Sequence, residues 1–393
     1  MSRRDRGLVC YDCGRRAPAD RARCSCGEPL WFPVEPAALA LNGHPANLWQ
    51  YASTLPPADP IGIARTAGGT PLFRAAALDA AAGCRVHIKD ETANPTGSFK
   101  DRGSAVGVAV AARGTRPVLT VSHGNMARSV AAMAAAAGLE CAVLVPADIP
   151  PERLGPIARF DPALFRVEGD YGALYDDALD IDGAVALNSD VPLRVAGQKT
   201  LAYEIAAALP EADGVVLPVS SGGNASAVWK GFRELARADV IDEPPALYLV
   251  QSAACAPIAT AFDSGATRPA TVDAGETIAY SIANPDPPSG ARALAAARET
   301  GGAVVAVGDE AIRRARARLS TRAGIAAEAA AATSLAGLQE LARRELLQVD
   351  DDVVAVMTGT GLLEAPEHGE QPPTITREAV AEAVGEHLGG REA

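Results

Sequence analysis

The chain has 393 residues, a formal net charge of −12 and a hydrophobic content of 48%, so we expect two or three domains with large buried cores. The acidic balance argues against a nucleic-acid or anionic-membrane surface, since both attract basic proteins. The longest apolar stretch, Val130 to Leu139, is too short to span a membrane, and no signal peptide is visible after Met1. We therefore expect a cytoplasmic protein without a nucleic-acid or membrane partner.

Four of the seven cysteines lie close together near the start of the chain. Two residues separate Cys10 from Cys13, and one residue separates Cys24 from Cys26. Thiolates in such tight pairs can converge on one tetrahedral zinc ion. The spacing predicts a zinc-knuckle-like segment over 1–33, whose ion is structural because four thiolates leave no open coordination position. Reduced thiols in a flexible leader are the alternative.

The middle of the chain alternates between strand and helix signals. A Pro-rich stretch over 34–60 predicts an extended connector ahead of this region. Ala-rich helical segments occupy 126–138 and 225–237. Short apolar runs of strand length occur at 118–121, 141–145, 214–219, 246–250 and 353–357. This alternation predicts an α/β fold with parallel sheets, right-handed crossovers and helices on both sheet faces.

Polar turns follow three of the predicted strands, at the edge where ligands bind in such sheets. The turn from Ser220 to Asn224 contains two glycines and precedes a helix, so its backbone N–H groups could hold a phosphate. Many Gly-rich turns bind nothing, and this one lacks the spacing of a dinucleotide or P-loop motif. A second turn runs from Ser122 to Asn125. Asn125 could either cap the next helix or point its amide at a ligand.

Lys100 is one of only four lysines and lies in the segment NPTGSFKDRG, Asn94 to Gly103. The turn residues predict a helix that starts near Ser98, which places Lys100 in its first turn. The positive helix terminus and Arg102 should then disfavour the ammonium and lower the lysine pKa. A partly neutral lysine can form a Schiff base with an aldehyde. An ordinary surface lysine is the alternative.

Taken together, these segments resemble the fold-type II pyridoxal-phosphate enzymes, and within them the threonine synthase family. The resemblance covers roughly 60–365. It rests on five segments: Asn94–Gly103, Gly197–Glu204, Ser220–Asn224 with Trp229–Gly231, Ile282–Pro285 and Thr358–Gly361. It implies two doubly wound parallel-sheet domains, a large cofactor domain over 61–105 and 196–365 and a small inserted domain over 106–195, followed by a tail over 366–393. A homodimer is common in this fold type.

The resemblance also implies roles for individual residues. Lys100 would form the internal aldimine with pyridoxal 5'-phosphate and move protons, and Phe99 would lie beside the pyridine ring. Asn125 would bind the phenolic oxygen of the cofactor, and Thr358 would face the pyridine nitrogen. The cofactor phosphate would rest on Ser220, Ser221, Gly222, Gly223 and Asn224. The candidate substrate-binding residues are Ser122, His123, Asn188, Ser189, Arg194 and Lys199.

The activity implied by the resemblance is conversion of O-phosphohomoserine and water to L-threonine and phosphate, by γ-elimination and β-addition of water. The chain departs from the family pattern at His123 and Met126, where the family has two hydroxyl donors. These departures leave open a divergent pyridoxal-phosphate-dependent serine/threonine dehydratase or β-replacement enzyme. A cofactor-binding protein with little catalysis is a third alternative, which an intact Lys100 disfavours.

Overall fold

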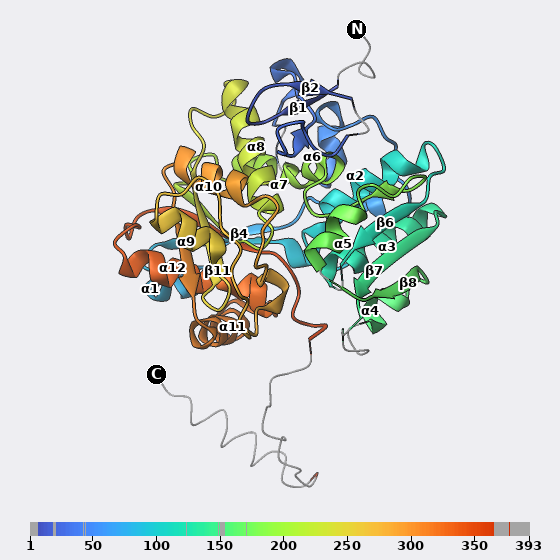
Figure 1. Cartoon of the computed structure of the whole chain (residues 1–393). Helices are drawn as coiled ribbons and strands as arrows, with labels where there is room; N and C mark the ends of the chain where they lie inside the picture. Colours follow the sequence, from blue (N-terminus) through green and yellow to red (C-terminus); the bar gives the residue numbers. More distant parts are fainter. Residues whose placement is uncertain are drawn as a thin grey trace. The chain divides into compact units, whose positions relative to one another are not determined.

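Three β-sheets organise the part of the chain that the structure describes (Figure 1). This computed structural model describes residues 7–18, 21–41, 43, 45–122, 124–147, 149, 154–169, 171–364 and 377. The predicted substrate residue His123 lies outside these ranges, as does the predicted tail over 366–393 apart from Arg377. Residues 1–362 form one unit that contains all three sheets.

The largest sheet has six strands in the order β12-β11-β10-β13-β5-β4. They are β4 (Leu72–Arg74), β5 (Arg85–Asp90), β10 (Gly214–Pro218), β11 (Ala246–Ser252), β12 (Val304–Val307) and β13 (Asp352–Met357). Five of the strands run parallel, as predicted, but β4 pairs antiparallel with β5. The link between β4 and β5 is too short for a parallel crossover, which needs about a dozen residues or more.

Helices cover both faces of this sheet, as expected for the α/β class. The side chain of Val216 packs into one core, with Leu335 and Ile312, while its neighbours Val215 and Leu217 pack into the other. This alternation follows from the two-residue period of a strand. The first face is covered by α1 (Asp79–Ala82), α11 (Asp309–Ala323) and α12 (Ala329–Arg343). The second is covered by α7 (Thr200–Ala208), α8 (Gly223–Arg237), α9 (Pro257–Asp263) and α10 (Gly290–Glu299).

A second, fully parallel sheet has four strands in the order β8-β7-β6-β9. Its strands are β6 (Val118–Val121), β7 (Cys141–Pro146), β8 (Ala163–Val167) and β9 (Val185–Ala186). The helices of this region are α2 (Lys100–Ala112), α3 (Asn125–Ala137), α4 (Gly155–Ala158), α5 (Tyr171–Asp177) and α6 (Pro192–Gln198). All the strands fall inside the predicted insertion over 106–195, whose exact boundaries stay a prediction. The predicted strands and helices all occur, with ends within two residues of those expected.

The third sheet is the small antiparallel one of the Cys-rich segment, made of β1 (Leu8–Cys10), β2 (Arg16–Ala17) and β3 (Leu30–Trp31). It contacts α8 through Trp31, whose ring lies edge-on to that of Trp229 with 5.5 Å between centroids. The prediction of an extended connector over 34–60 is wrong in part. The segment contains two short 3-10 helices, η2 (Pro36–Ala38) and η3 (Leu48–Thr54), and a third, η4 (Gly62–Thr66), follows it. Leu48 and Tyr51 are buried and hold η3 against the rest of the protein. The many prolines of the segment had indicated an extended chain instead.

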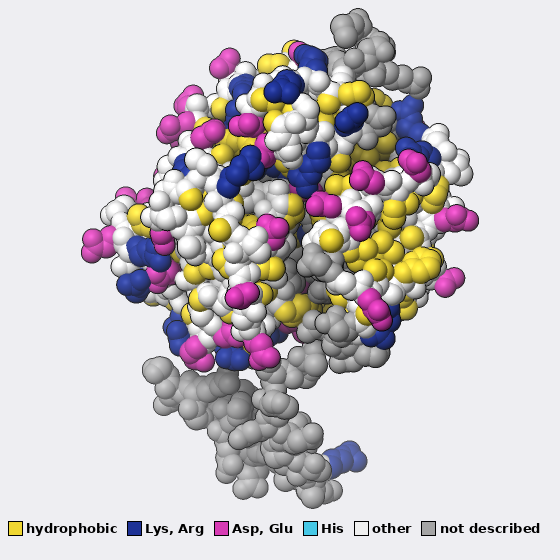
Figure 2. Space-filling view, in the orientation of Figure 1, with side chains coloured by type: hydrophobic (Ala, Val, Ile, Leu, Met, Phe, Trp, Pro, Cys, Tyr) yellow, Lys and Arg dark blue, Asp and Glu magenta, His cyan; other side chains and the backbone are white. Residues whose placement is uncertain are grey.

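The visible face of the molecule carries charged side chains of both signs side by side (Figure 2). Apolar side chains gather on the part of that face that lies over the four-stranded sheet. Within the described residues, no helix is both long enough and apolar enough to cross a bilayer.

A fully buried ion network fixes the first turns of α2 against the large sheet. The Arg102 guanidinium donates to Glu91 Oε2 at 2.7 Å and to Glu204 Oε1 at 2.6 Å. Lys89 Nζ donates to Glu204 Oε2 at 2.7 Å, and the Gly69 N–H donates to Glu204 Oε1 at 2.9 Å. Burial acts to raise the pKa of Glu204, but Arg102 and Lys89 outweigh it and lower the pKa to about 2. The network therefore joins β5, α2 and α7 through charges that are paired with one another.

Replacing Arg102 should destabilise the fold strongly, because Arg102→Ala leaves two buried carboxylates short of a partner. We expect a loss of about 3–5 kcal/mol in the free energy of unfolding, measured by urea denaturation. The matched control is Arg343→Ala, because Arg343 pairs with Glu340 at 2.7 Å but is 69% exposed. That variant should lose no more than about 1 kcal/mol. Equal losses would contradict a special role for the buried network.

Candidate active site

Lys100 is the first residue of α2, and the segment before it is paired with the end of β13. The Phe99 N–H donates to the Thr358 carbonyl oxygen at 3.0 Å, and the Thr360 N–H donates to the Gly97 carbonyl oxygen at 2.9 Å. Gly97 has a left-handed φ of +81°, and a Cβ there would lie 2.6 Å from Thr360 Cγ2. Two motifs that are about 260 residues apart in the sequence thus meet at the carboxyl edge of the large sheet, as the sequence predicted.

The amine of Lys100 lies in a half-buried position, with Nζ 4.7 Å from the centroid of the Phe99 ring. Burial, followed by the positive charge of Arg194, lowers its pKa to about 7, while Glu328 acts in the opposite direction. The lowered pKa agrees with the sequence argument, but the cause differs. Arg102 has no part in it, because Glu91 and Glu204 neutralise its charge.

The other three lysines are buried and engaged in ion pairs. Lys89 pairs with Glu204 at 2.7 Å, and Lys199 and Lys230 both pair with Glu234. Lys199, a predicted substrate ligand, also donates to the Thr54 carbonyl oxygen at 3.0 Å. None of these partners is another predicted site residue. The amine of Lys199 is therefore engaged by Thr54 and Glu234, and its role as a substrate ligand stays a prediction.

Arg194, in α6, is a fully buried cation without a carboxylate partner among the described residues. Its Nη1 donates to Ser104 Oγ at 2.8 Å, and its Nη2 donates to the Lys100 carbonyl oxygen at 3.1 Å. Its Nε is buried without a hydrogen-bond partner. Burial lowers the pKa of Arg194 to about 10. A buried guanidinium in this state is electrostatically prepared for an anion.

Asn125 is the first residue of α3 and directs its amide toward Glu328, which precedes α12. Asn125 Nδ2 donates to Glu328 Oε2 at 2.8 Å. Gly359 lies against both, since a Cβ there would be 2.4 Å from Glu328 Oε1 and 2.9 Å from Asn125 Nδ2. Glu328 was not among the predicted site residues. In the sequence it is the glutamate that precedes an Ala-rich helix, and its neighbours at the site, Asn125 and Gly359, are distant from it or lie in another segment.

The turn between β10 and α8 has the properties of a phosphate-binding turn. Gly222 has a φ of +83°, and a Cβ on it would lie 2.5 Å from the Ser289 carbonyl oxygen. Gly223 begins α8. Both polar atoms of the Asn224 side chain are buried without a hydrogen-bond partner, and so is Ser98 Oγ next to Phe99. Since buried polar groups are normally satisfied, these atoms fit a polar ligand that the polypeptide does not supply.

The remaining predicted substrate residues lie around the start of α3 and the loop before α6. Ser122 Oγ accepts from the Gly124 N–H at 3.3 Å, and Ser189 Oγ lies 3.5 Å from Met126 Sδ. Asn188 uses both ends of its amide inside the protein. It accepts from the Val121 N–H at 3.0 Å and donates to the Tyr175 carbonyl oxygen at 3.1 Å, so its contacts join β6 to α5.

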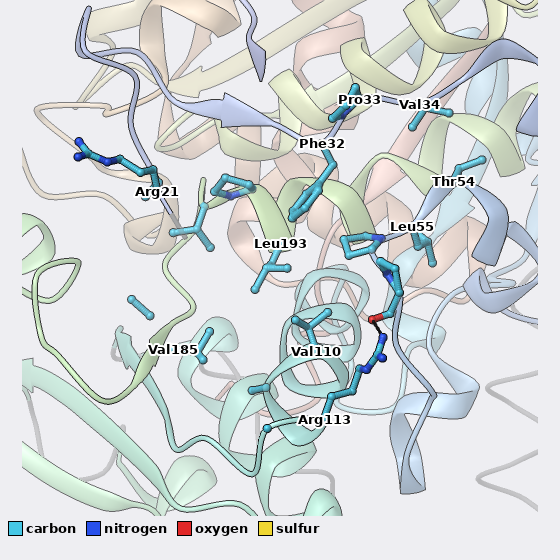
Figure 3. Close-up of a pocket in the computed structure, with 18 of the residues that line it drawn as sticks. Arg21, Phe32, Pro33, Val34, Thr54, Leu55, Val110, Arg113, Val185 and Leu193 are labelled. Atoms are coloured by element: carbon cyan, nitrogen blue, oxygen red, sulfur yellow. Dashed lines mark hydrogen bonds between the residues drawn. The ribbon is translucent and has the colours of Figure 1, made fainter. Parts of the chain in front are cut away.

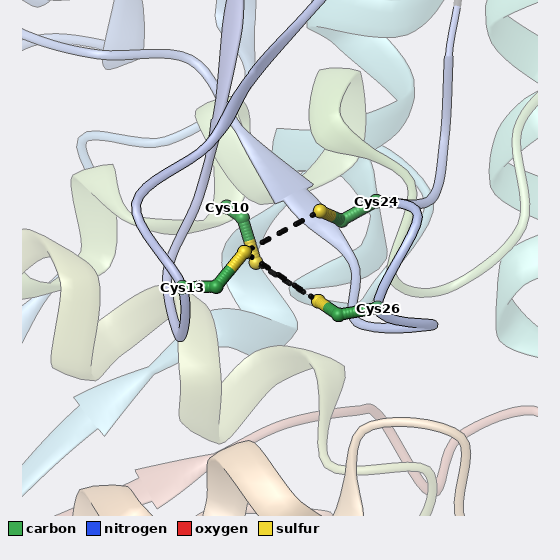
Figure 4. A group of neighbouring side chains, drawn as sticks. All are labelled: Cys10, Cys13, Cys24 and Cys26. Atoms are coloured by element: carbon green, nitrogen blue, oxygen red, sulfur yellow. Dashed lines mark hydrogen bonds between the residues drawn. The ribbon is translucent and has the colours of Figure 1, made fainter.

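The four cysteines Cys10, Cys13, Cys24 and Cys26 form a second cluster of side chains (Figure 4). Their sulfur atoms all lie within 4.8 Å of one another. Cys10 and Cys26 are 3.6 Å apart, as are Cys13 and Cys24, while Cys13 and Cys26 are 3.7 Å apart. A tetrahedral zinc ion with bonds of about 2.3 Å holds its sulfur ligands about 3.8 Å apart. The convergence that the spacing predicted is present.

Known proteins similar to this chain belong to one enzyme family. Residues 63–359 match the family described as "Pyridoxal-phosphate dependent enzyme". The threonine synthase of Methanocaldococcus jannaschii is 36% identical, with 90% of this chain and 92% of that protein covered. The threonine synthase of Methanosarcina acetivorans is 35% identical, with coverages of 96% and 98%.

Solved structures of similar fold include two plant enzymes. A threonine deaminase from Solanum lycopersicum has a TM-score of 0.66 at 21% identity, covering 84% of this chain and 94% of that one. A maize serine racemase has a TM-score of 0.65 at 20% identity, with coverages of 82% and 93%. At such identities the likeness concerns the fold alone.

The lowered pKa of Lys100 should make stability depend on pH. Without cofactor, the unfolded chain keeps the Lys100 proton up to about 10.5, whereas the folded chain releases it near 7. Stability therefore rises with pH between these values, because the unfolded state binds more protons. Lys100→Met removes this contribution, so its stability gain over the original protein should be largest near pH 7 and shrink toward pH 9. Urea denaturation at both pH values measures the gap, and a gap that does not change would contradict the lowered pKa.

Proposed function

Because this chain belongs to the family of pyridoxal-phosphate dependent enzymes and, within it, to the threonine synthases, we propose that it converts O-phosphohomoserine and water to L-threonine and phosphate. It is a pyridoxal-phosphate-dependent lyase. The observation that carries the proposal is similarity to threonine synthases over nearly the full length of both chains. A cytoplasmic homodimer is part of the proposal.

A dehydratase or β-replacement activity is not favoured. Similar solved structures include a threonine deaminase, an L-serine ammonia-lyase and an O-ureido-L-serine synthase. They are only 20–23% identical to this chain, so the likeness concerns the fold. Racemases share the same fold, so architecture does not distinguish these reactions. Threonine synthase is therefore the activity that the relatives support, in spite of the departures at His123 and Met126.

The residues around Lys100 fit pyridoxal phosphate. Bound there, the cofactor supplies an aldehyde that reacts with an amine and an electron sink for a carbanion. The unpartnered amide of Asn224 and the backbone of the Ser220–Gly223 turn would hold its phosphate. Asn125 has a second N–H on Nδ2 besides the one that Glu328 accepts, and this N–H would bind the phenolic oxygen. Thr358 would offer a neutral hydroxyl to the pyridine nitrogen, which favours elimination over transamination.

Lys100 is suited to move protons during the reaction. With a pKa of about 7, its amine is present in both protonation states at neutral pH. It can therefore take a proton from substrate carbon and later return one. Glu328 attracts the charged form, so the carboxylate stabilises the ammonium that exists after Lys100 has taken a proton and before it returns one.

Arg194 is the residue best placed to bind the substrate phosphate. Its guanidinium is buried, its Nε has no partner, and no carboxylate of the described residues pairs with it. Its Nη2 is tied to the backbone of Lys100, so an anion bound by Arg194 would lie close to the reacting amine. Ser122 and Ser189 stay predicted ligands of the same phosphate.

The activity is tested by incubating the cofactor-loaded protein with O-phosphohomoserine and following phosphate and threonine. We expect the two products in equal amounts, and a visible absorption band that borohydride abolishes. Lys100→Ala should lose the band and at least about a hundredfold in kcat, because proton transfer by a positioned group contributes that much or more. Lys230→Ala is the matched control, and it should keep the band. Keto acid and ammonia from serine or threonine, without phosphate release from O-phosphohomoserine, would refute the proposal.

We further propose that Cys10, Cys13, Cys24 and Cys26 hold one structural zinc ion. The sulfur separations support this assignment, and four thiolates complete a tetrahedral site. No reaction step is assigned to the ion.

Metal analysis tests the zinc site. The purified protein should contain one zinc ion per chain, and Cys13→Ser should lose most of it, since a structural site needs all four ligands. Cys255→Ser, which changes a buried cysteine outside the cluster, is the control and should keep full zinc content. Zinc-free protein that unfolds at the same temperature as the original would argue against the site.

A further inference from the structure

Asp190 is a buried carboxylate at the point where three parts of the chain meet, and the reaction as described does not use it. Its side chain is 2% exposed. Arg23 of the Cys-rich segment approaches it at 3.2 Å, and Arg292 of α10 approaches it at 3.6 Å. The Ser289 hydroxyl donates to Asp190 Oδ2 at 3.0 Å, and the Tyr175 hydroxyl donates to Oδ1. Burial acts to raise the pKa of Asp190, but the two arginines outweigh it and lower the pKa.

The partners of Asp190 also shape the phosphate-binding turn. The Ser289 N–H donates to the Ser221 carbonyl oxygen at 2.8 Å, and Ser289 closes over Gly222. On the other side of the turn, a Cβ on Gly223 would lie 2.9 Å from the carbonyl oxygen of Ser189, the residue next to Asp190. The backbone of the turn therefore lies between Ser289 and the loop that contains Ser189 and Asp190. The hydrogen bond from Ser289 to Asp190 joins these two sides of the turn.

The Cys-rich segment reaches the same carboxylate from outside. Arg23 is adjacent to Cys24, and Tyr11 is adjacent to Cys10. The guanidinium of Arg292 lies 5.6 Å from the Tyr11 ring and 5.9 Å from the Trp31 ring, so both arginines that pair with Asp190 contact this segment. A metal ion that fixes the cysteines would also fix Arg23 and Tyr11, because each is one residue away from a ligand.

An open space lies beside this contact. A cavity of about 1060 Å³ is lined by Arg21 and Ala22, which precede Arg23, and by Val191 and Pro192, which follow Asp190 (Figure 3). Arg21 and Ala22 border this space on one side, while the Leu30 N–H holds the segment by donating to the Ala22 carbonyl oxygen at 3.1 Å. The position of Arg23 therefore depends on the fold of the Cys-rich segment more than on packing against the rest of the protein.

We propose that the Cys-rich segment sets the affinity of the phosphate-binding turn for pyridoxal phosphate, with Asp190 as the positioning residue between them. The inference rests on the proposed function, because it takes the Ser220–Asn224 turn as the phosphate site. When Arg23 leaves, Asp190 keeps Arg292, at 3.6 Å, as its one cation. The carboxylate that holds Ser289 beside the turn is then less firmly fixed. The coupling passes from Arg23 through two side chains in contact, Asp190 and Ser289, to the turn.

The test measures pyridoxal phosphate binding itself, by calorimetric titration of the full chain freed of cofactor, with the metal present and after chelation. Chelation should raise the Kd of the original protein about tenfold or more, within the usual range of coupling between sites. Arg23→Ala should show the raised Kd already with metal and change little on chelation. The control is Arg268→Ala, since Arg268 also pairs with the segment, at Glu28, but is 65% exposed and does not pair with Asp190. It should behave like the original protein.

Each outcome has a distinct meaning. If chelation leaves the Kd of the original protein unchanged, or if Arg23→Ala binds the cofactor as tightly as the original, the coupling is refuted while the proposed function stands. If the original protein binds no pyridoxal phosphate in either state, the proposed function itself fails. Should Arg23→Ala not fold, the chelation experiment on the original protein still decides, and Asp190→Asn, which keeps the acceptor for Ser289 but removes the charge, should raise the Kd with metal present.

Discussion

The site depends on one backbone pairing, in which residues 97–99 lie antiparallel to 358–360. Two hydrogen bonds, from Phe99 to Thr358 and from Thr360 to Gly97, place the start of α2 against the end of β13. This contact positions the rest of the site. Lys100 directly follows Phe99, and Gly359 lies against both Asn125 and Glu328. The Arg102 network behind it holds the helix in register, so that the amine has a fixed position before any ligand arrives.

Buried charge has two opposite uses in this protein. Arg102, Lys89 and Lys199 are neutralised by glutamates and serve the fold. Arg194 and Lys100 lie close together, and neither forms an ion pair with a carboxylate of the described residues. Bringing two such cationic groups together costs free energy, which an anionic ligand can recover. The contrast between paired and unpaired groups thus separates structural from functional residues more clearly than burial alone.

Much of this arrangement could be read from local sequence. Apolar runs and Gly-rich turns predicted the parallel strands, the turn between β10 and α8 and the position of Lys100 near a helix start, because each depends on neighbours along the chain. Glu328, Asp190 and the true cause of the Lys100 pKa depend on partners far away in sequence, so no local pattern encodes them. The connector over 34–60 was misjudged because its prolines outweighed Leu48 and Tyr51, whose binding surface belongs to other segments.

The distribution of lysines has a chemical consequence. Three of the four amines are enclosed and bonded to carboxylates, which leaves the surface almost without primary amines apart from the chain's own amino terminus. Reactive aldehydes in solution, which modify exposed lysines of most proteins, would find a single lysine side chain outside an ion pair here. Reductive labelling of primary amines would therefore report on Lys100 and the amino terminus.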